Sequence, residues 1–414
     1  MITKRSAETE DNQNNESVEH LVSFRAIDRD FNLLLTQNKD IISSQFNAFT
    51  VDSNGRKKPI SVDLNDHYKG SVDGIDGSEV RAHIDPSTGL MIASIHTGDE
   101  TFEVEPIWRL SETHRNNFSS MIVFKHSDLK HSANGSASES TPICDYIKID
   151  DNITTEEFDT NERIRRKRDS FYNEIGIGID INSDFKPSAT HCSVILVADY
   201  YFYRDMGDSD IQTTTNYLVH IIDRVNNIFT NTEWSIDDSN PGFKGMGFFI
   251  KEIQIHEEFD EKDNHYNSPT RRTVAQLLEI YSQTEENSQF CLAHLFTHRK
   301  FDNSVLGLAY VASPRATSVG GVCSPTYEKL GRKLYLNTGL TTTKNQFDNR
   351  IITREAVLVT AHEFGHNWGA EHDPDTSECS PPARIGGSYV MYTYSVTGYE
   401  KNNKVFLVFY HFFD

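Results

Sequence analysis

Long apolar runs are scarce in this sequence of 414 residues. The most apolar stretch, Val405–Phe413, has about half of the roughly 20 residues that a membrane-spanning helix requires, so we expect no membrane span in this chain. An apolar core near the N-terminus is also absent, because Met1–Arg5 leads directly into acidic and Asn-rich residues. The beginning of the chain therefore lacks the pattern of a secretory signal peptide and indicates a fragment or an unusual start.

Positive charge is also in short supply. The 40 Lys and Arg residues are outnumbered by 61 Asp and Glu residues, which gives a formal net charge of -21. Nucleic acids and anionic membranes carry negative charge and would repel such a chain. The composition therefore argues against both as main partners, while the length predicts two or three domains.

Cysteine is sparse, and its number is odd. The five cysteines are Cys144, Cys192, Cys291, Cys323 and Cys379. They cannot all pair within one chain, so at least one has another role. Four N-x-S/T sequons, each of which could arise by chance, lie at Asn15, Asn117, Asn134 and Asn152. Their clustering favours a glycoprotein of an oxidising compartment, which conflicts with the absent signal peptide and suggests missing sequence.

The N-terminal half has the pattern of a small β-rich domain. Residues 1–18 are acidic and Asn-rich, and we expect them to be disordered. Short alternating segments such as Leu90–Ile95 and Thr101–Ile107 follow, separated by Asp-Gly and Ser-Thr-Gly turns. Residues 150–168 turn from acidic to basic and have the composition of a linker. We therefore assign residues 19–168 to one β-rich domain.

The second half alternates strands with helices. The continuous apolar run Ser193–Ala198 predicts a buried central strand. Further strands are expected at Phe248–Ile255, Cys291–Thr297 and Leu306–Ala312, and helices at 213–228, Val274–Tyr281 and Thr353–Asn367. This order predicts an α/β domain over residues 169–404, followed by a hydrophobic tail at residues 405–414.

The stretch His362–Asp373 fits the pattern H-E-x-x-H-x-x-G-x-x-H at every defined position. On a helix, His362 and His366 share one face, so both imidazoles can reach one ion at about 2.0 to 2.1 Å. Gly369 can adopt a left-handed conformation without a Cβ penalty, and a turn there would bring His372 round as a third ligand. Three neutral nitrogens and an open fourth position are the donor set of a catalytic Zn²⁺.

Glu363 follows the first of these ligands on the helix and would lie beside the water at the open position. Its carboxylate could accept the water's proton during attack on a carbonyl and pass it to the leaving amine. The alternative is a helix with unrelated surface histidines, since the sequence has 17. Five defined residues at this spacing would arise by chance in roughly one of ten thousand such chains, so a metalloendopeptidase is favoured.

With Met391 following, the motif resembles that of a metzincin protease, and Asp373 directly after the third His is typical of the adamalysin (ADAM) family. The stretches Gly369–Asp375 and Gly386–Tyr392 resemble the subgroup of the tumour-necrosis-factor-alpha-converting enzyme, a sheddase. The likeness runs from about residue 20 to Lys404. It implies an α/β fold in which a β-rich pro-domain precedes a metzincin catalytic domain, with a mixed twisted sheet, long helices, a zinc helix and a Met-turn.

The resemblance also implies roles outside the motif. Met391 would form the Met-turn, an apolar floor under the zinc histidines, although an ordinary core methionine is the alternative. The edge strand at Leu306 and Gly307 would pair with an extended substrate. The pocket just beyond the cut would include Val396, whose small apolar side chain favours medium aliphatic residues.

Arg163–Arg168 lies between the two predicted domains and contains the dibasic pattern of furin-like convertases, and we assign the processing site to Arg165 and Arg168. Exposed linkers at domain boundaries are accessible to proteases, so we favour a processing site over a solvated run of charge. Cleavage after Arg168 would release residues 169 onward.

Cys144 lies where the family has its cysteine switch, a thiolate that fills the open zinc position until the pro-segment leaves. Asp145 replaces the family's usual glycine and adds an acid beside that thiolate. An unpaired or intermolecular thiol is the alternative.

The family pattern further implies a disulfide between Cys192 and Cys291. In the family, the cysteines that pair with the counterparts of Cys323 and Cys379 lie after the position of Lys404. There the sequence changes to a tail unlike the family, which we expect to be a splice read-through or gene-model artefact.

We therefore interpret the chain as the zymogen of a zinc endopeptidase that sheds membrane-protein ectodomains after processing by a furin-like convertase. The parent family belongs to the secretory pathway and cell surface, and this chain would be a secreted or retained fragment. A truncated, non-catalytic product that acts as decoy or pro-domain chaperone, or a secreted soluble peptidase, remains an alternative.

Overall fold

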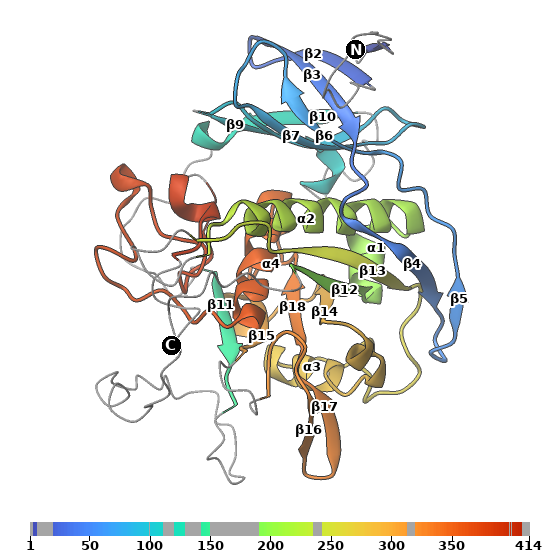
Figure 1. Ribbon diagram of the computed structural model, residues 1–414. Coiled ribbons are helices and arrows are strands. Elements are labelled where there is room, and N and C mark those ends of the chain that lie inside the picture. Colours follow the sequence, from blue (N-terminus) through green and yellow to red (C-terminus); the bar gives the residue numbers. More distant parts are fainter. Residues whose placement is uncertain are drawn as a thin grey trace.

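The structure is a computed structural model of the chain (Figure 1). It describes residues 3–5, 20–98, 100–110, 120–128, 142–149, 190–234, 242–312, 319–396, 398 and 400–407. These residues form two eight-stranded sheets, a two-stranded hairpin and four α-helices. Strands and helices alternate in the second half as the sequence predicts, so the α/β class is confirmed.

An antiparallel sheet forms the upper lobe in Figure 1, in the order β1-β2-β3-β6-β7-β8-β9-β10. Its strands are β1 (Thr3–Arg5), β2 (His20–Ala26), β3 (Arg29–Gln37), β6 (His67–Val72), β7 (Glu79–Ile84), β8 (Met91–His96), β9 (Thr101–Pro106) and β10 (Met121–Lys125). Alternation drives its packing: along β3, Phe31, Leu33 and Leu35 are fully buried, whereas Asn32 between them is exposed. The expected β-rich N-terminal half is confirmed.

The second sheet forms the body of the molecule, in the order β11-β15-β18-β14-β12-β13-β4-β5. Its strands are β4 (Ile42–Val51), β5 (Lys57–Pro59), β11 (Ile143–Ile147), β12 (His191–Ala198), β13 (Gly247–His256), β14 (Leu292–Thr297), β15 (Val305–Tyr310) and β18 (Thr338–Thr342). A small hairpin, β16 (Thr326–Lys329) and β17 (Arg332–Tyr335), projects from it. The sheet is mixed, because β15 runs antiparallel to its neighbour β18.

Helices cover both faces of this sheet. They are α1 (Tyr200–Asp205), α2 (Ile211–Asn231), α3 (Val274–Tyr281) and α4 (Thr353–Trp368). Short 3-10 turns are η1 (Ile107–Arg109), η3 (His126–Asp128), η4 (Glu285–Gln289), η5 (Asp302–Ser304), η6 (Ala383–Ile385) and η7 (Lys401–Lys404). Val194 and Leu196 of β12 share a buried cluster with α2 and α4, whereas Ile195 and Val197 share one with α3. A strand buried on both faces explains the continuous apolar run in the sequence.

The N-terminal half contributes strands to both ends of this second sheet. β4 pairs in parallel with β13, and β11 pairs in parallel with β15. Residues 19–168 were predicted to be one β-rich unit, but the strands of this region are divided between two sheets. Alternating hydrophobicity identifies a strand without identifying its partner, which explains the difference.

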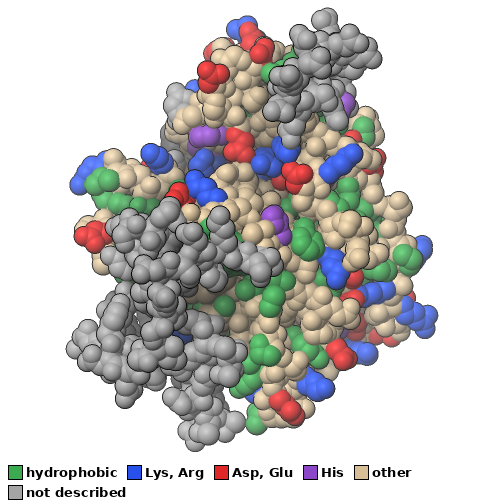
Figure 2. All heavy atoms as spheres, viewed as in Figure 1, with side chains coloured by type: hydrophobic (Ala, Val, Ile, Leu, Met, Phe, Trp, Pro, Cys, Tyr) green, Lys and Arg blue, Asp and Glu red, His purple; other side chains and the backbone are tan. Residues whose placement is uncertain are grey.

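The upper lobe rests on α2 and α4. A band of acidic, basic and histidine side chains crosses the face in Figure 2 where the lobe meets the body. Asp223 of α2, for example, bonds to Arg81 of β7 at 3.0 Å and to Asn38 at 2.7 Å. The lobe and the body are therefore joined by polar contacts between side chains.

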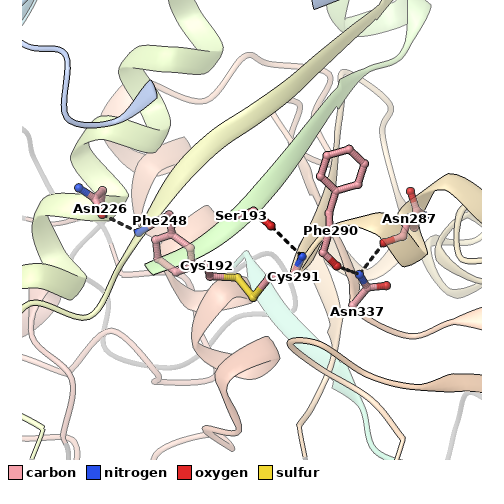
Figure 3. Close-up of a disulfide and its surroundings, with 8 residues drawn as sticks. All are labelled: Cys192, Ser193, Asn226, Phe248, Asn287, Phe290, Cys291 and Asn337. Carbon is pink, nitrogen blue, oxygen red and sulfur yellow. Dashed lines mark hydrogen bonds between the residues drawn. A yellow bond between two sulfur atoms is a disulfide. The ribbon is translucent and has the colours of Figure 1, made fainter. Parts of the chain in front are cut away.

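A disulfide between Cys192 and Cys291 links the start of β12 to the residue before β14, with the Cα atoms 5.4 Å apart (Figure 3). The Cys291 amide also donates to the Ser193 hydroxyl at 3.2 Å, so the two neighbouring strands are fastened at one end. This is the pairing that the family resemblance implies. Cys144 and Cys379 are buried free thiols, and Cys323 is an exposed one.

The residues just after Lys404 pack into the buried cluster that α2 and α4 share. Phe406 is buried, with its ring 4.8 Å from that of Phe229. The amide of Val390 donates to the carbonyl of Val405 at 3.1 Å. Residues 405 and 406, which the sequence analysis assigned to a separate tail, thus belong to the packed structure, and residues 408–414 lie outside the described ranges.

Candidate active site

Helix α4 carries two of the three histidines of the motif. His362 and His366 lie one turn apart on it, and their ring centroids are 4.5 Å apart. The helix ends at Gly369, whose φ of 110° is left-handed, and the chain then turns back. This turn brings His372 to the same point, and one ring nitrogen of each histidine lies within 4.8 Å of those of the other two.

Backbone carbonyls hold the first two imidazoles in one orientation. Nδ1 of His362 lies 2.6 Å from the carbonyl oxygen of Val390, and Nδ1 of His366 lies 2.7 Å from that of Ala370. A proton on each Nδ1 leaves the lone pair of Nε2 for a metal ion. Burial lowers the pKa of His362 to about 4, which favours the neutral, ligating form.

The donor set fits a metal ion. Nε2 of His362 is buried and has no hydrogen-bond partner among the described residues, an arrangement that costs free energy unless a ligand is bound there. Three imidazoles from one helix and the turn after it match the ligands of a catalytic metal with an open position. These residues can therefore hold a divalent ion.

Glu363 lies on α4 beside β15. The glycine at position 307 of that strand has no side chain and so leaves room for the Glu363 carboxylate. A Cβ atom at Gly307 would overlap the Glu363 carboxylate. The carboxylate is fully buried, and burial raises its pKa well above the ordinary value. A carboxyl group with a raised pKa next to a metal position is suited to moving a proton.

Met391 packs against α4, the helix that carries His362 and His366. It is 1% exposed, and its sulfur packs so closely on α4 that a Cβ atom at Gly365 would overlap it. Its carbonyl accepts the amide of Asp373 at 2.9 Å, which ties this turn to the residue after His372. Its position agrees with the floor that the resemblance implies.

Strand β11 occupies the edge that the sequence analysis assigned to substrate. It pairs with β15 on one side, where Cys144 is opposite Gly307. On the other side, the Cys144 amide donates to the carbonyl of Thr393 at 3.1 Å, and the Ser395 amide donates to that of Pro142 at 2.9 Å. The chain's own N-terminal half thus fills the space between the edge strand and the 393–395 segment.

The thiol of Cys144 points into the site. Its sulfur lies within 4.8 Å of a ring nitrogen of His362 and a carboxylate oxygen of Glu363. Burial raises the pKa of the Cys144 thiol well above its ordinary value, and the Glu363 carboxylate adds to this effect. Asp145 is exposed, because successive side chains of a strand point to opposite faces.

Three residues of the site escaped the sequence analysis. The ring of Tyr146 packs 4.8 Å from His366 and 4.9 Å from His372, and the ammonium of Lys148 forms an ion pair with Glu371. Tyr146 and Lys148 lie two and four residues after Cys144, so the period of a strand could have indicated that they face the same way.

The pocket wall also contains a carboxyl group that the sequence analysis did not single out. Glu355 of α4 is half-buried, and burial raises its pKa to about 7 against the influence of the Ser395 hydroxyl. Val396, predicted to line this pocket, is 9% exposed. Leu306 of β15 is fully buried in the cluster of α2 and α4.

The predicted processing residues Arg165 and Arg168 lie outside the described residues, as do the four sequons. None of the helices in the described ranges combines the length and the apolar character that crossing a bilayer requires.

The fold and the three-histidine site define a metalloendopeptidase of the metzincin type. Residues 188–406 match the model of metallo-peptidase family M12, and the chain belongs to that family. The expected relationship to the ADAM proteases is also confirmed by individual relatives. The chain is 32% identical over 408 residues to the Disintegrin and metalloproteinase domain-containing protein 17 homolog of Caenorhabditis elegans, an alignment that covers 93% of this chain and 55% of that protein.

A second relative is the human Disintegrin and metalloproteinase domain-containing protein 10, which is 28% identical over 408 residues, covering 93% of this chain and 50% of that protein. The chain therefore spans about half the length of the curated relatives it matches.

Proposed function

We propose that the protein is the zymogen of a zinc-dependent endopeptidase that cleaves peptide bonds in the ectodomains of membrane proteins. The position of Cys144 beside His362 and Glu363 is the observation that carries this proposal. A thiol at the open ligand position would block the site for as long as β11 remains paired with β15. The relatives named as metalloproteinases support the chemistry.

His362, His366 and His372 would hold the ion. When bound, zinc would polarise a water molecule and lower its pKa to about 7. Glu363 would take the proton of that water and deliver it to the departing amine. The unpaired edge of β15, once β11 has left, would align the substrate by main-chain hydrogen bonds.

Activation would begin in the linker. A furin-like convertase would cut after Arg168, and the Cys192–Cys291 disulfide supports folding in an oxidising compartment of the secretory pathway. Cleavage alone leaves the strand pairing intact, so β11 must also dissociate before the groove opens.

Two variants test the site. Glu363→Ala should keep stoichiometric zinc in elemental analysis but lose about 100-fold or more of peptide cleavage, because it removes the base and none of the ligands. His366→Ala should lose zinc as well as activity. A convertase-treated Glu363→Ala protein that cleaves at the wild-type rate would contradict the assignment.

The substrate class needs a separate test. Cells that display a tagged type I membrane protein should release its ectodomain when the convertase-treated protein is added, and the Glu363→Ala protein serves as the matched control. Cleavage of free peptides without release of any displayed ectodomain would argue for a soluble peptidase instead.

A further inference from the structure

The geometry points to Glu371 as a residue that selects substrates. We propose that, once β11 has left, the Glu371 carboxylate binds a Lys or Arg side chain of the substrate about two to four residues before the scissile bond. This inference rests on the proposed function and adds a charge preference to it.

The pro-segment itself supplies the first observation. The Lys148 ammonium contacts Oε1 of Glu371, and the Tyr146 hydroxyl donates to Oε2 at 3.4 Å. The Tyr146 ring also packs against His366 and His372, with ring centroids 4.8 and 4.9 Å apart, so its contact with Glu371 lies next to the three histidines. A basic side chain of an extended strand in this groove is thus already seen to reach Glu371.

The path of β11 identifies which part of a substrate would take its place. Cys144 is opposite Gly307 and lies at the metal position, and the register continues to Ile147 opposite Tyr310. Tyr146 and Lys148 therefore lie toward the C-terminal end of β15. A substrate that pairs antiparallel with β15 has its N-terminal residues at this end, which are the residues before the scissile bond.

Charge completes the argument. Among the ion pairs of the described residues, Glu371 takes part only in the one with Lys148. Its side chain is 41% exposed even with β11 in position, so departure of the strand leaves an accessible carboxylate without its cation. That carboxylate would attract a basic side chain and repel an acidic one.

The competing explanation is that this ion pair serves only to keep the zymogen inactive. In that case Lys148 and Glu371 would only hold the pro-segment in place, and Glu371 would have no influence after β11 has gone. The two explanations differ in what the opened enzyme prefers.

The first experiment uses the full chain after convertase cleavage. Peptides that differ only in Lys, Gln or Glu at the second, third or fourth residue before the cut are compared by kcat/KM at low salt. The wild type should cleave the best Lys peptide about two- to fivefold faster than its Gln counterpart, the range of a partly exposed ion pair. In Glu371→Gln the Lys and Gln peptides should be cleaved at equal rates. In Glu371→Lys the Glu peptide should be cleaved faster than the Lys peptide.

Glu378→Gln provides the matched control. Glu378 is an exposed carboxylate of the same loop and forms no ion pair among the described residues. It should retain the Lys preference, and zinc content is measured for every variant because Glu371 adjoins a ligand. Equal cleavage of Lys and Glu peptides by the wild type, or a preference that survives in Glu371→Gln, overturns the inference.

A binding measurement separates this inference from the proposed function. A fluorescent peptide of residues 141–149 should bind the cleaved protein more tightly than its Lys148→Glu version, and Glu371→Lys should reverse that order. Charge-dependent binding without any peptide cleavage would refute the endopeptidase and leave the Glu371 contact supported. Cleavage with binding that ignores charge would refute the role of Glu371 alone.

Discussion

Glu103 of β9 and Arg224 of α2 form a buried two-point ion pair between the upper lobe and the catalytic half. The two nitrogen–oxygen distances are 3.0 and 2.7 Å, and the exposed fractions of the side chains are 1% and 8%. His126 and Arg354 also contact the carboxylate, at 3.0 and 3.4 Å. Burial opposes ionisation of Glu103, but Arg224, the hydrogen bond with His126 and Arg354 outweigh it and hold the pKa of the carboxyl well below its usual range.

Glu103→Gln should therefore weaken the docking of the lobe. The change leaves two buried guanidinium groups without their counter-ion, which costs about 3 to 5 kcal/mol. Denaturant unfolding at neutral pH should show this loss, whereas the exposed Glu261→Gln should lie within about 0.5 kcal/mol of wild type. A Glu103→Gln protein as stable as the control would mean that water or a rearranged partner replaces the carboxylate.

The buried histidines of the same interface should make the protein sensitive to acid. His67 and His83 lie 4.9 Å apart between centroids, and Nε2 of His67 is 3.4 Å from Asn216 of α2. Burial lowers the pKa of His67 to about 4, against opposing contributions from Asn216 and Asp63, and lowers that of His83 well below its ordinary value. Between about pH 6.5 and 4, the unfolded chain therefore binds more protons at these histidines than the folded chain does. The free energy of unfolding consequently decreases as the pH falls through this range.

His67→Gln should remove one such contribution. The loss of unfolding free energy between pH 7.5 and pH 5.0 should shrink by about 2 kcal/mol relative to wild type, because one fewer group takes up a proton on unfolding. Denaturant titrations at both pH values measure the difference. His191→Gln, at an exposed position of β12, is the control and should follow the wild-type curve.

Gly307→Ala should disable the site without removing a ligand. The added methyl group would overlap the Glu363 carboxylate and displace it from β15. We expect peptide cleavage to fall about 100-fold or more, with zinc retained. Leu308→Val on the opposite face of the strand should lower stability and spare the carboxylate. Comparable activities for the two variants would show that Glu363 can move aside.

Cys144→Ala should partly activate the uncleaved chain, because loss of the thiol opens the metal position and removes one contact that keeps β11 in the groove, so that β11 dissociates more readily. The test uses a background in which Arg165 and Arg168 are replaced by Ala, so that no convertase can process the linker. Peptide cleavage should appear in Cys144→Ala and stay absent in Asp145→Ala, because the Asp145 side chain is exposed. If Cys144→Ala cleaves no peptide while the convertase-cleaved wild type is active, then the strand pairing of β11, and not the thiol, keeps the zymogen inactive.

Local sequence was sufficient to predict that the three histidines of the motif lie together and to predict most of the helices and strands of the second half. His362 and His366 are fixed by the period of one helix, and a glycine three residues after the second His allows the turn that returns His372. β12, α3 and α4 were foreseen for the same reason, since apolar runs and periods are properties of contiguous residues. The family resemblance supplied the disulfide, which no local pattern specifies, and it is also the source of the roles proposed for Met391 and Cys144.

Tertiary structure alone decided where the N-terminal half lies. Nothing in the alternation of β4 or β11 indicates that each joins the catalytic sheet, because a strand's hydrophobic pattern fixes the face it buries and not the neighbour it pairs with. The same holds for Glu103 with Arg224 and for Lys148 with Glu371, which lie far apart in the chain. In the sequence, these four residues have the character of ordinary charged surface residues. Docking of the upper lobe brings the first pair within bonding distance, and docking of β11 does so for the second.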